Sequence, residues 1–124
     1  PVDFPAMMHS ASDHIVQGFM NRPYAGAEGL YREASPSCFT GLRPPPFLVV
    51  HGTADTGEKS GQVPIGISRR FAERLRAAGG DATFLSIEGA PHGFLYHPDR
   101  EHDKIMWRAA VPFLEKHLGG DVLK

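Results

Sequence analysis

The sequence has 124 residues, enough for one domain at most, and its 41% hydrophobic and 22% charged residues are typical of a soluble globular protein. Thirteen basic and fourteen acidic residues nearly balance without long blocks of either sign, which argues against a nucleic-acid surface or a polybasic membrane patch. No apolar run approaches the ~18 residues that span a bilayer. No targeting segment is recognisable in these residues, so the sequence does not indicate the cellular compartment. Because the sequence begins at Pro1, a processed or truncated product is expected.

Residues 1–46 are expected to form an irregular, partly helical, lid-like connection. Ser12 or Asp13 can cap a short helix over residues 14–20. Pro23 should end this helix, because the residue before a proline is pushed out of the helical region. The run of prolines at 44–46 then predicts an extended entry into the next element.

The pattern from residue 47 to 118 predicts a strand–helix–strand–helix unit. "FLVV" at 47–50 suits a strand buried on both faces of a parallel sheet, and "DATFLSIEG" contains a second strand at 82–87. The helix between them, in "IGISRRFAERLRAAGG", has an apolar stripe at Ile67, Phe71, Leu75 and Ala78. The final helix has its stripe at Ile105, Ala109, Phe113 and His117, with Pro112 expected to bend it.

This unit predicts an α/β fold with part of a doubly wound parallel sheet. Residues 1–124 are expected to form a single, partial domain. Two strands make a poor independent sheet, since stable sheets usually contain three or more. We therefore expect the edge of the first strand to be covered by another segment or another chain.

Two polar residues follow the two predicted strands. Asp55 comes after the first strand in "HGTAD" and His92 after the second in "APHGF". The carboxyl ends of parallel strands meet at one edge of the sheet, where such groups gather. A carboxylate there can orient an imidazole and stabilise its cation. Gly52, with Gly89 or Gly93, permits the tight turns that expose both groups. The alternative is that both residues have structural roles only, with Asp55 capping its turn and His92 an ordinary loop histidine.

The run "PPPFLVVHGTAD…VPIGISRRFAERLRAAGGDATFLSIEGAPHGF" resembles the C-terminal part of α/β-hydrolase esterases, especially the hormone-sensitive-lipase-like and the feruloyl- or acetylxylan-esterase-like groups. "YREASP" at 31–36 resembles the segment before the acid-bearing strand, and "PVDF" at 1–4 resembles the stretch just after the strand that follows the nucleophile elbow. The resemblance implies that Asp55 and His92 are the acid and base of a catalytic triad. It also implies a small-molecule ester substrate and no cofactor or metal. Prolyl-oligopeptidase-type peptidases share a similar ending.

Two features depart from the family. No G-x-S-x-G nucleophile elbow and no HGG-type oxyanion loop occur in these residues. The connection "TGEKSGQ" at 56–62 is longer than usual and is expected to be a mobile rim loop, either solvated or in contact with substrate. None of the possible replacement serines lies on a strand-to-helix elbow; these are Ser10, Ser12, Ser60 and Ser68. An Asp–His pair cannot form an acyl-enzyme without an activated nucleophile.

The remaining candidates favour ordinary structural roles. Cys38, the single cysteine, is expected to be a partly buried structural thiol. The histidine groups His9 with His14, and His97 with His102 and Asp103, lack metal-site spacing. Packing is also the expected role of four aromatic residues that could otherwise wall a substrate pocket: Tyr24, Tyr31, Phe94 and Trp107.

The leading hypothesis is a serine-type carboxylic ester hydrolase to which this chain contributes Asp55 and His92. The nucleophilic serine and the oxyanion hole would come from a segment outside these residues or from another chain. The first alternative is an inactive half-domain that assembles with itself or a partner. The second is the C-terminal part of a prolyl-oligopeptidase-type peptidase. The sequence does not specify the acyl or alcohol group.

Overall fold

The structure, a computed structural model, describes residues 2–39, 44–96 and 100–119. The first part is more helical than the sequence suggests. It contains α1 (Phe4–Met7), α2 (Asp13–Met20), α3 (Glu28–Glu33) and a short 3-10 helix, η1 (Pro36–Cys38). The helix expected over 14–20 is confirmed as α2, which ends at Asn21 in the left-handed conformation (φ 51°). Asn tolerates this backbone geometry better than most residues, so the helix stops before the proline is reached.

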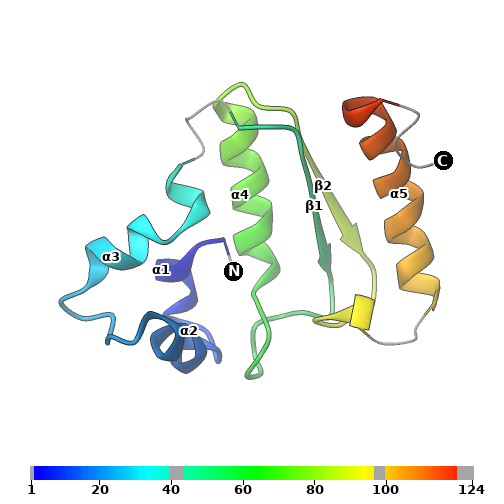
Figure 1. Cartoon of the computed structure of the whole chain (residues 1–124). Helices are drawn as coiled ribbons and strands as arrows, with labels where there is room; N and C mark the ends of the chain where they lie inside the picture. Colours follow the sequence, from blue (N-terminus) through cyan, green and yellow to red (C-terminus); the bar gives the residue numbers. More distant parts are fainter. Residues whose placement is uncertain (1, 40–43, 97–99, 120–124) are drawn as a thin grey trace.

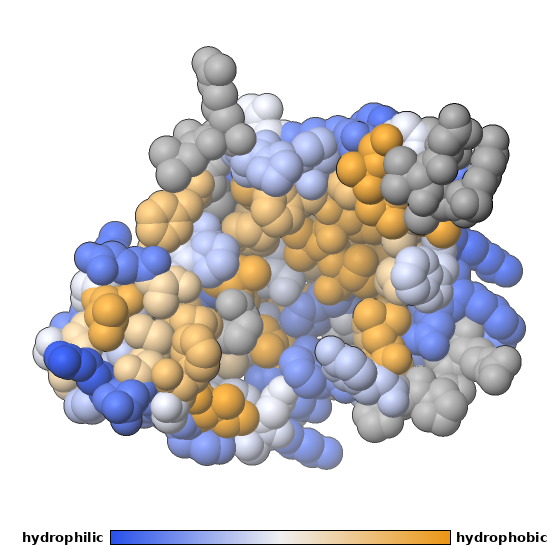
Figure 2. All heavy atoms as spheres, viewed as in Figure 1, coloured by the Kyte–Doolittle hydropathy of each residue, from blue (hydrophilic) through white to orange (hydrophobic). Residues whose placement is uncertain are grey.

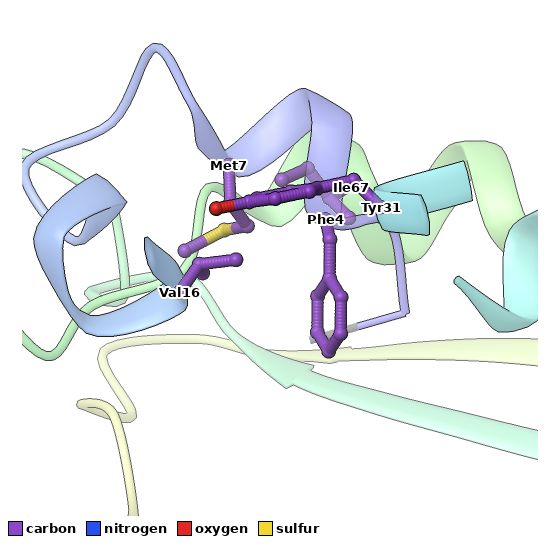
Figure 3. Close-up of a cluster of buried hydrophobic side chains, with 5 residues drawn as sticks. All are labelled: Phe4, Met7, Val16, Tyr31 and Ile67. Carbon is purple, nitrogen blue, oxygen red and sulfur yellow. The ribbon is translucent and has the colours of Figure 1, made fainter. Parts of the chain in front are cut away.

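A cluster of buried side chains fixes these helices to the rest of the molecule (Figure 3). Its members are Phe4, Met7, Val16, Tyr31 and Ile67. Tyr31 is fully buried, and its hydroxyl donates a hydrogen bond of 2.5 Å to the Arg22 carbonyl. Burial raises the pKa of the Tyr31 phenol, because the charged phenolate is poorly solvated there. The expected packing role of Tyr31 is therefore confirmed.

The α/β unit has the predicted order and a three-layer arrangement (Figure 1). Strands β1 (Phe47–Gly52) and β2 (Ala82–Ile87) pair in parallel, in a register from Phe47 opposite Ala82 to Gly52 opposite Ile87. Helix α4 (Ile65–Ala77) covers one face, and α5 (Arg100–Leu118) covers the other. Short 3-10 helix η2 (Phe94–Tyr96) follows β2. The connection β1–α4–β2 is the crossover that the sequence predicts.

Alternate residues of β1 supply the two cores. Phe47 and Val49 pack with Phe71 and Leu75 of α4. Leu48 and Val50 pack on the opposite face, in the cluster that contains Met106 and Ala110 of α5. This alternation follows from the period of two in an extended strand.

The expectation that "FLVV" is buried on both faces is met only in part, because residues 47–50 are half-buried. In the described part of the chain β1 pairs only with β2, so its second edge lacks a neighbouring strand. Figure 2 shows apolar side chains gathered over this strand, between α4 and α5. The sheet thus presents apolar surface where a wider parallel sheet would continue.

Three sequence expectations are wrong at single residues. In α5 Met106 and Ala110 are buried and Ile105 is exposed, whereas the other predicted stripe residues, Ala109, Phe113 and His117, are half-buried. The Cys38 thiol is exposed rather than partly buried. In the single turn of η1 it is the neighbouring Ser37 that is buried, which leaves Cys38 facing solvent. Trp107 is also exposed on α5, away from the core.

None of the helices in the described ranges combines the length and apolar character needed to cross a bilayer.

Candidate active site

Asp55 lies in a tight turn directly after β1. The turn is closed by a hydrogen bond of 3.1 Å from the Asp55 amide to the Gly52 carbonyl. Asp55 is only 4% exposed, and the backbone N–H of Val63 donates to its Oδ1 atom at 2.7 Å. A buried carboxylate needs such donors, because burial without partners carries a large desolvation penalty. The second oxygen, Oδ2, faces two histidines.

His92 follows β2 in a turn between two glycines with left-handed backbone, Gly89 (φ 71°) and Gly93 (φ 67°). Its Nδ1 atom lies 2.7 Å from Asp55 Oδ2. The two turns are joined directly, since the Gly89 amide donates to the Thr53 hydroxyl at 2.8 Å. The side chain of His92 is 50% exposed, while that of Asp55 is buried. The structure therefore brings together the two residues selected from the sequence.

This geometry defines what the pair can do chemically. Because a carboxylate only accepts hydrogen bonds, the contact with Asp55 places a proton on His92 Nδ1. The other ring nitrogen, Nε2, is then able to take up or release a proton. A buried acid that orients a half-exposed imidazole is the arrangement of an acid–base pair in acyl transfer.

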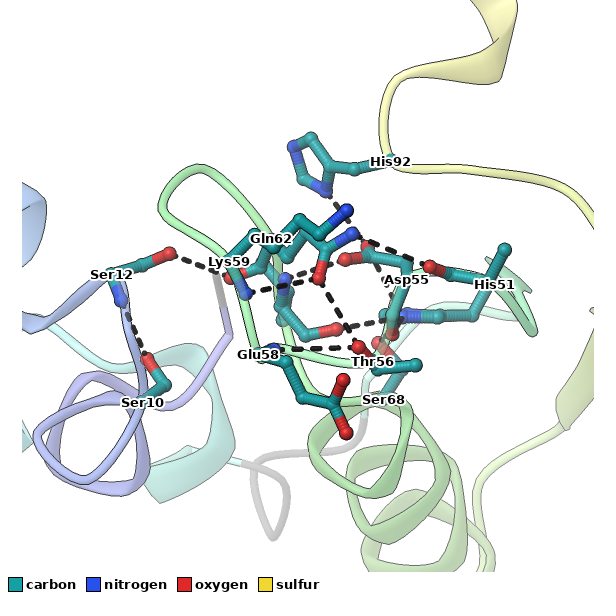
Figure 4. A network of polar contacts seen from close by, with 12 residues as sticks. Ser10, Ser12, His51, Asp55, Thr56, Glu58, Lys59, Gln62, Ser68 and His92 are labelled. Atoms are coloured by element: carbon teal, nitrogen blue, oxygen red, sulfur yellow. Dashed lines mark hydrogen bonds and ion pairs between the residues drawn. The ribbon is translucent and has the colours of Figure 1, made fainter.

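A third residue, His51, lies on a different side of Asp55 (Figure 4). Its Nε2 atom is 3.3 Å from Asp55 Oδ2 and 3.0 Å from the Val63 carbonyl oxygen. Its Nδ1 atom is 2.8 Å from the hydroxyl of Ser68 on α4. His51 is not among the residues predicted from the sequence, although its position at the end of a strand, four residues before Asp55, is a signal that could have indicated it.

The long connection at 56–62 is held by hydrogen bonds in this structure. The Gln62 side chain accepts from the Thr56 hydroxyl and from the Lys59 amide, both at 3.2 Å. The loop also contacts the N-terminal segment, because Ser12 donates to the Gln62 carbonyl at 2.7 Å and the Ala11 amide donates to Gly57 at 3.3 Å. The expected position at the rim of the site is thus observed, with a defined set of contacts.

No serine in the described ranges bonds to His92. Ser10 donates to the Met7 carbonyl, Ser12 to the Gln62 carbonyl, and Ser60 contacts His14. Ser68 contacts His51, on the far side of the acid from His92. Each hydroxyl has a partner other than the candidate base, which agrees with the inference that none of them is the nucleophile.

Two cavities adjoin His92. One, of about 390 Å³, runs along β1 and the turn after β2 and includes Val50, Asp55 and Phe94 in its walls. The other, of about 230 Å³, lies between α2 and the 56–62 loop. Phe94 is buried, so it both packs in the core and lines the larger cavity.

No group of three or more possible metal ligands occurs among residues 2–39, 44–96 and 100–119. His97 lies outside the described residues, so the structure leaves its proposed grouping with His102 and Asp103 untested.

Comparison with known proteins agrees with this architecture, although no family model matches the chain. Esterase LipQ of Mycobacterium tuberculosis is 35% identical over 89 residues, which are 71% of this chain and 19% of the relative. Esterase LipC of the same organism is 39% identical over 66 residues, or 52% of this chain and 15% of the relative. The butyrate-bound esterase Est2 of Thermogutta terrifontis is similar to the structure with a TM-score of 0.61 and 30% identity, over 82% of this chain and 38% of that one.

The fold of this chain corresponds to part of the α/β-hydrolase fold found in these esterases. It spans less than a fifth of the length of the two mycobacterial relatives. In the described part of the chain one edge of β1 has no neighbouring strand. An α/β-hydrolase fold explains this open edge, because its parallel sheet contains more strands. The same fold places catalytic side chains at the carboxyl ends of its strands, where Asp55 and His92 lie.

Proposed function

We propose that Asp55 and His92 are the acid and the base of a serine-type carboxylic ester hydrolase. The observation that carries the proposal is the 2.7 Å contact between His92 Nδ1 and the buried carboxylate of Asp55. His92 Nε2 takes the proton of a serine hydroxyl as the serine attacks the ester carbonyl, and it later returns this proton to the leaving alcohol. Asp55 keeps the imidazole in the required tautomer and stabilises its cation.

The serine and the oxyanion hole belong, in this proposal, to a segment outside the 124 residues. That segment would extend the sheet beside β1 and so cover the half-buried residues 47–50. A small-molecule ester is the expected substrate. Support comes from the relatives named esterases and from the Thermogutta terrifontis enzyme, whose structures include a butyrate-bound form and one phosphorylated by paraoxon.

Covalent labelling of the intact protein tests this function. A fluorophosphonate should attach to one serine outside residues 1–124, and peptide mapping by mass spectrometry locates the attachment. The variant His92→Ala should lose most of the labelling rate, because the serine is then no longer deprotonated. Labelling that is absent in the wild type, or that persists unchanged in His92→Ala, contradicts the proposal.

A second candidate function is assembly without catalysis. It is favoured by the half-buried side chains of residues 47–50 and by the edge of β1 that lacks a neighbouring strand in the described part of the chain. In this case a second copy or a partner chain pairs with β1, and the protein hydrolyses no ester. Sedimentation analysis separates the two candidates. The N–H groups of Phe47 and Thr53 point towards β2, so by strand alternation the N–H of Leu48 points to the open edge. A dimer that dissociates when Leu48 is replaced by Pro, together with absence of fluorophosphonate labelling, supports assembly over hydrolysis.

A further inference from the structure

The cavity of about 230 Å³ beside His92 has an apolar lining. Its apolar walls are formed by Met7 of α1, Ile15 and Val16 of α2, and Val63. The described lining contains no Lys, Arg, Asp or Glu side chain. Its Ser12 hydroxyl already donates to the Gln62 carbonyl at 2.7 Å. A charged guest would be poorly compensated here, so the cavity suits an uncharged apolar group.

The 56–62 loop completes this cavity. Gly61 and Gln62 line it opposite α2, and they are held there by the bond between Gln62 and Ser12. The loop is the part of the sequence that departs from the family pattern. A shorter connection between Asp55 and Val63 would remove this wall, so the cavity depends on the 56–62 loop.

We propose that this cavity binds the apolar alkyl or aryl part of the ester's alcohol, an inference that rests on the proposed function. His92 lies in the cavity wall, and a base of this type gives its proton to the leaving alcohol oxygen. That oxygen must therefore lie within hydrogen-bond reach of the imidazole, and the carbon chain attached to it extends from there. With ~30 Å³ for each water-sized group, the cavity of about 230 Å³ holds roughly seven or eight heavy atoms, enough for a butyl or a phenyl group.

Ile15 provides the test, because it lines the cavity and is 48% exposed, so a larger side chain can be introduced without repacking the core. The intact protein is assayed with acetate esters of methyl, butyl and phenyl alcohols. In Ile15→Trp the ratio of kcat/KM for phenyl acetate to that for methyl acetate should fall about tenfold or more. In Ile15→Ala the ratio should rise. Leu30→Trp on α3, at 41% exposure and outside the cavity, is the matched control and should keep the wild-type ratio.

A parallel series with methanol as the fixed alcohol and acyl groups of increasing length distinguishes the other outcomes. If Ile15→Trp changes the acyl series and leaves the alcohol series unchanged, the cavity is an acyl site and the inference is wrong. Ratios unchanged in both Ile15 variants also contradict it. These results leave the proposed function standing, provided that His92→Ala is inactive. Failure of the wild type to hydrolyse any ester overturns both.

A second inference is carried independently by the hydrogen bonds of His51, which is only 7% exposed. Its Nε2 atom faces the Val63 carbonyl and the Asp55 carboxylate, which are both acceptors, so this nitrogen must carry a proton. The Val63 amide in turn donates to the other oxygen of Asp55. His51 and Val63 therefore both contact the Asp55 carboxylate, and the bond between them also links β1 to the segment that leads into α4.

The geometry points to His51 as a positioning residue that acts through Asp55, again given the proposed function. His51→Leu should lower kcat about 100-fold with KM changed less than threefold, since a small displacement of a reacting group has an effect of this size. His51→Gln restores an N–H near the position of Nε2 and should recover at least tenfold of the loss. The proton NMR signal between His92 and Asp55, which appears at low field, should shift or disappear in His51→Leu.

A purely structural role predicts a different pattern. In that case the melting temperature falls in both variants, while kcat for the folded fraction and the low-field signal stay at wild-type values. This pattern would overturn the positioning role. If His51→Leu is too unstable to purify, Ser68→Ala replaces it, because removal of the hydroxyl 2.8 Å from Nδ1 takes away one of the contacts that orient the His51 ring. Asp55→Asn is assayed alongside, and its full activity would instead contradict the proposed function.

Discussion

Gly52 and Ala90 approach so closely that a Cβ atom on Gly52 would lie 2.1 Å from the Ala90 carbonyl oxygen. Gly52 ends β1 three residues before Asp55, and Ala90 begins the turn that carries His92. The same Ala90 oxygen accepts a hydrogen bond of 3.1 Å from the Ala54 amide. This contact therefore sets the distance between the two turns, and with it the distance between the acid and the base.

Gly52→Ala should separate these turns. The overlap involves backbone atoms, which cannot rotate away, and overpacking of this kind costs about 1–3 kcal/mol. We expect kcat/KM of the intact protein to fall more than the loss of stability explains, because Asp55 and His92 move apart. Gly18→Ala in α2 is the control, since its Cβ meets no atom within 4 Å and should stabilise the helix by ~0.5–1 kcal/mol. Wild-type kcat/KM in Gly52→Ala would show that the close contact is unimportant.

Tyr31 should make the fold sensitive to alkaline pH. Burial raises the pKa of its phenol above the ordinary value of 10.0, so the folded state holds the proton more tightly than the unfolded chain. The resulting stability is fully present below pH 10 and is lost as the pH rises through the folded-state pKa. Melting temperatures measured between about pH 8 and pH 11 check this.

Tyr31→Phe should flatten this alkaline decline. It should also lower stability at neutral pH by about 0.5–1.5 kcal/mol, because the hydrogen bond to Arg22 is lost. Tyr96→Phe is the matched control at an exposed position and should retain the wild-type pH profile. An alkaline decline that is equal in all three proteins would assign the effect to other groups.

Gln62 should control the order of the 56–62 loop. Its side chain links Ala54, Thr56 and Lys59, and each net hydrogen bond contributes at most ~1 kcal/mol at such an exposed position. In Gln62→Ala, amide hydrogen exchange should accelerate over residues 56–62 and remain unchanged in β2. Glu58→Ala is the control, because in the described part of the chain no hydrogen bond is formed by its carboxylate. Equal exchange in the two variants would contradict the role of Gln62.

Sequence patterns predicted the α/β unit well because apolar runs and helical apolar stripes, which are local patterns, indicate its strands and helices. The strand at 82–87 has the predicted bounds, and the α4 stripe packs as expected through Ile67, Phe71 and Leu75. The fourth predicted stripe residue, Ala78, lies just after the helix and is exposed. Asp55 and His92 could be paired because parallel topology alone brings the ends of both strands together.

The remaining features depend on contacts between distant segments. Ile105 was assigned to the buried stripe of α5 because Ile105 and Met106 are both apolar, and only packing against the sheet decides which one is buried. The bonds of the 56–62 loop to Ala11 and Ser12 could not be predicted, because they come from a segment far away in sequence. His51 was missed because its contact with Ser68 depends on where α4 lies.

Whether Asp55 and His92 form the acid–base pair of an ester hydrolase is tested by kcat/KM of the intact protein for p-nitrophenyl butyrate. We predict that Asp55→Asn and His92→Gln each lower kcat/KM by about 10³–10⁴-fold while remaining folded. The matched controls Asp81→Asn, an exposed carboxylate paired with Lys116, and His9→Gln should keep wild-type activity within about twofold. Folded Asp55→Asn and His92→Gln proteins that retain the activity of these controls would contradict the account.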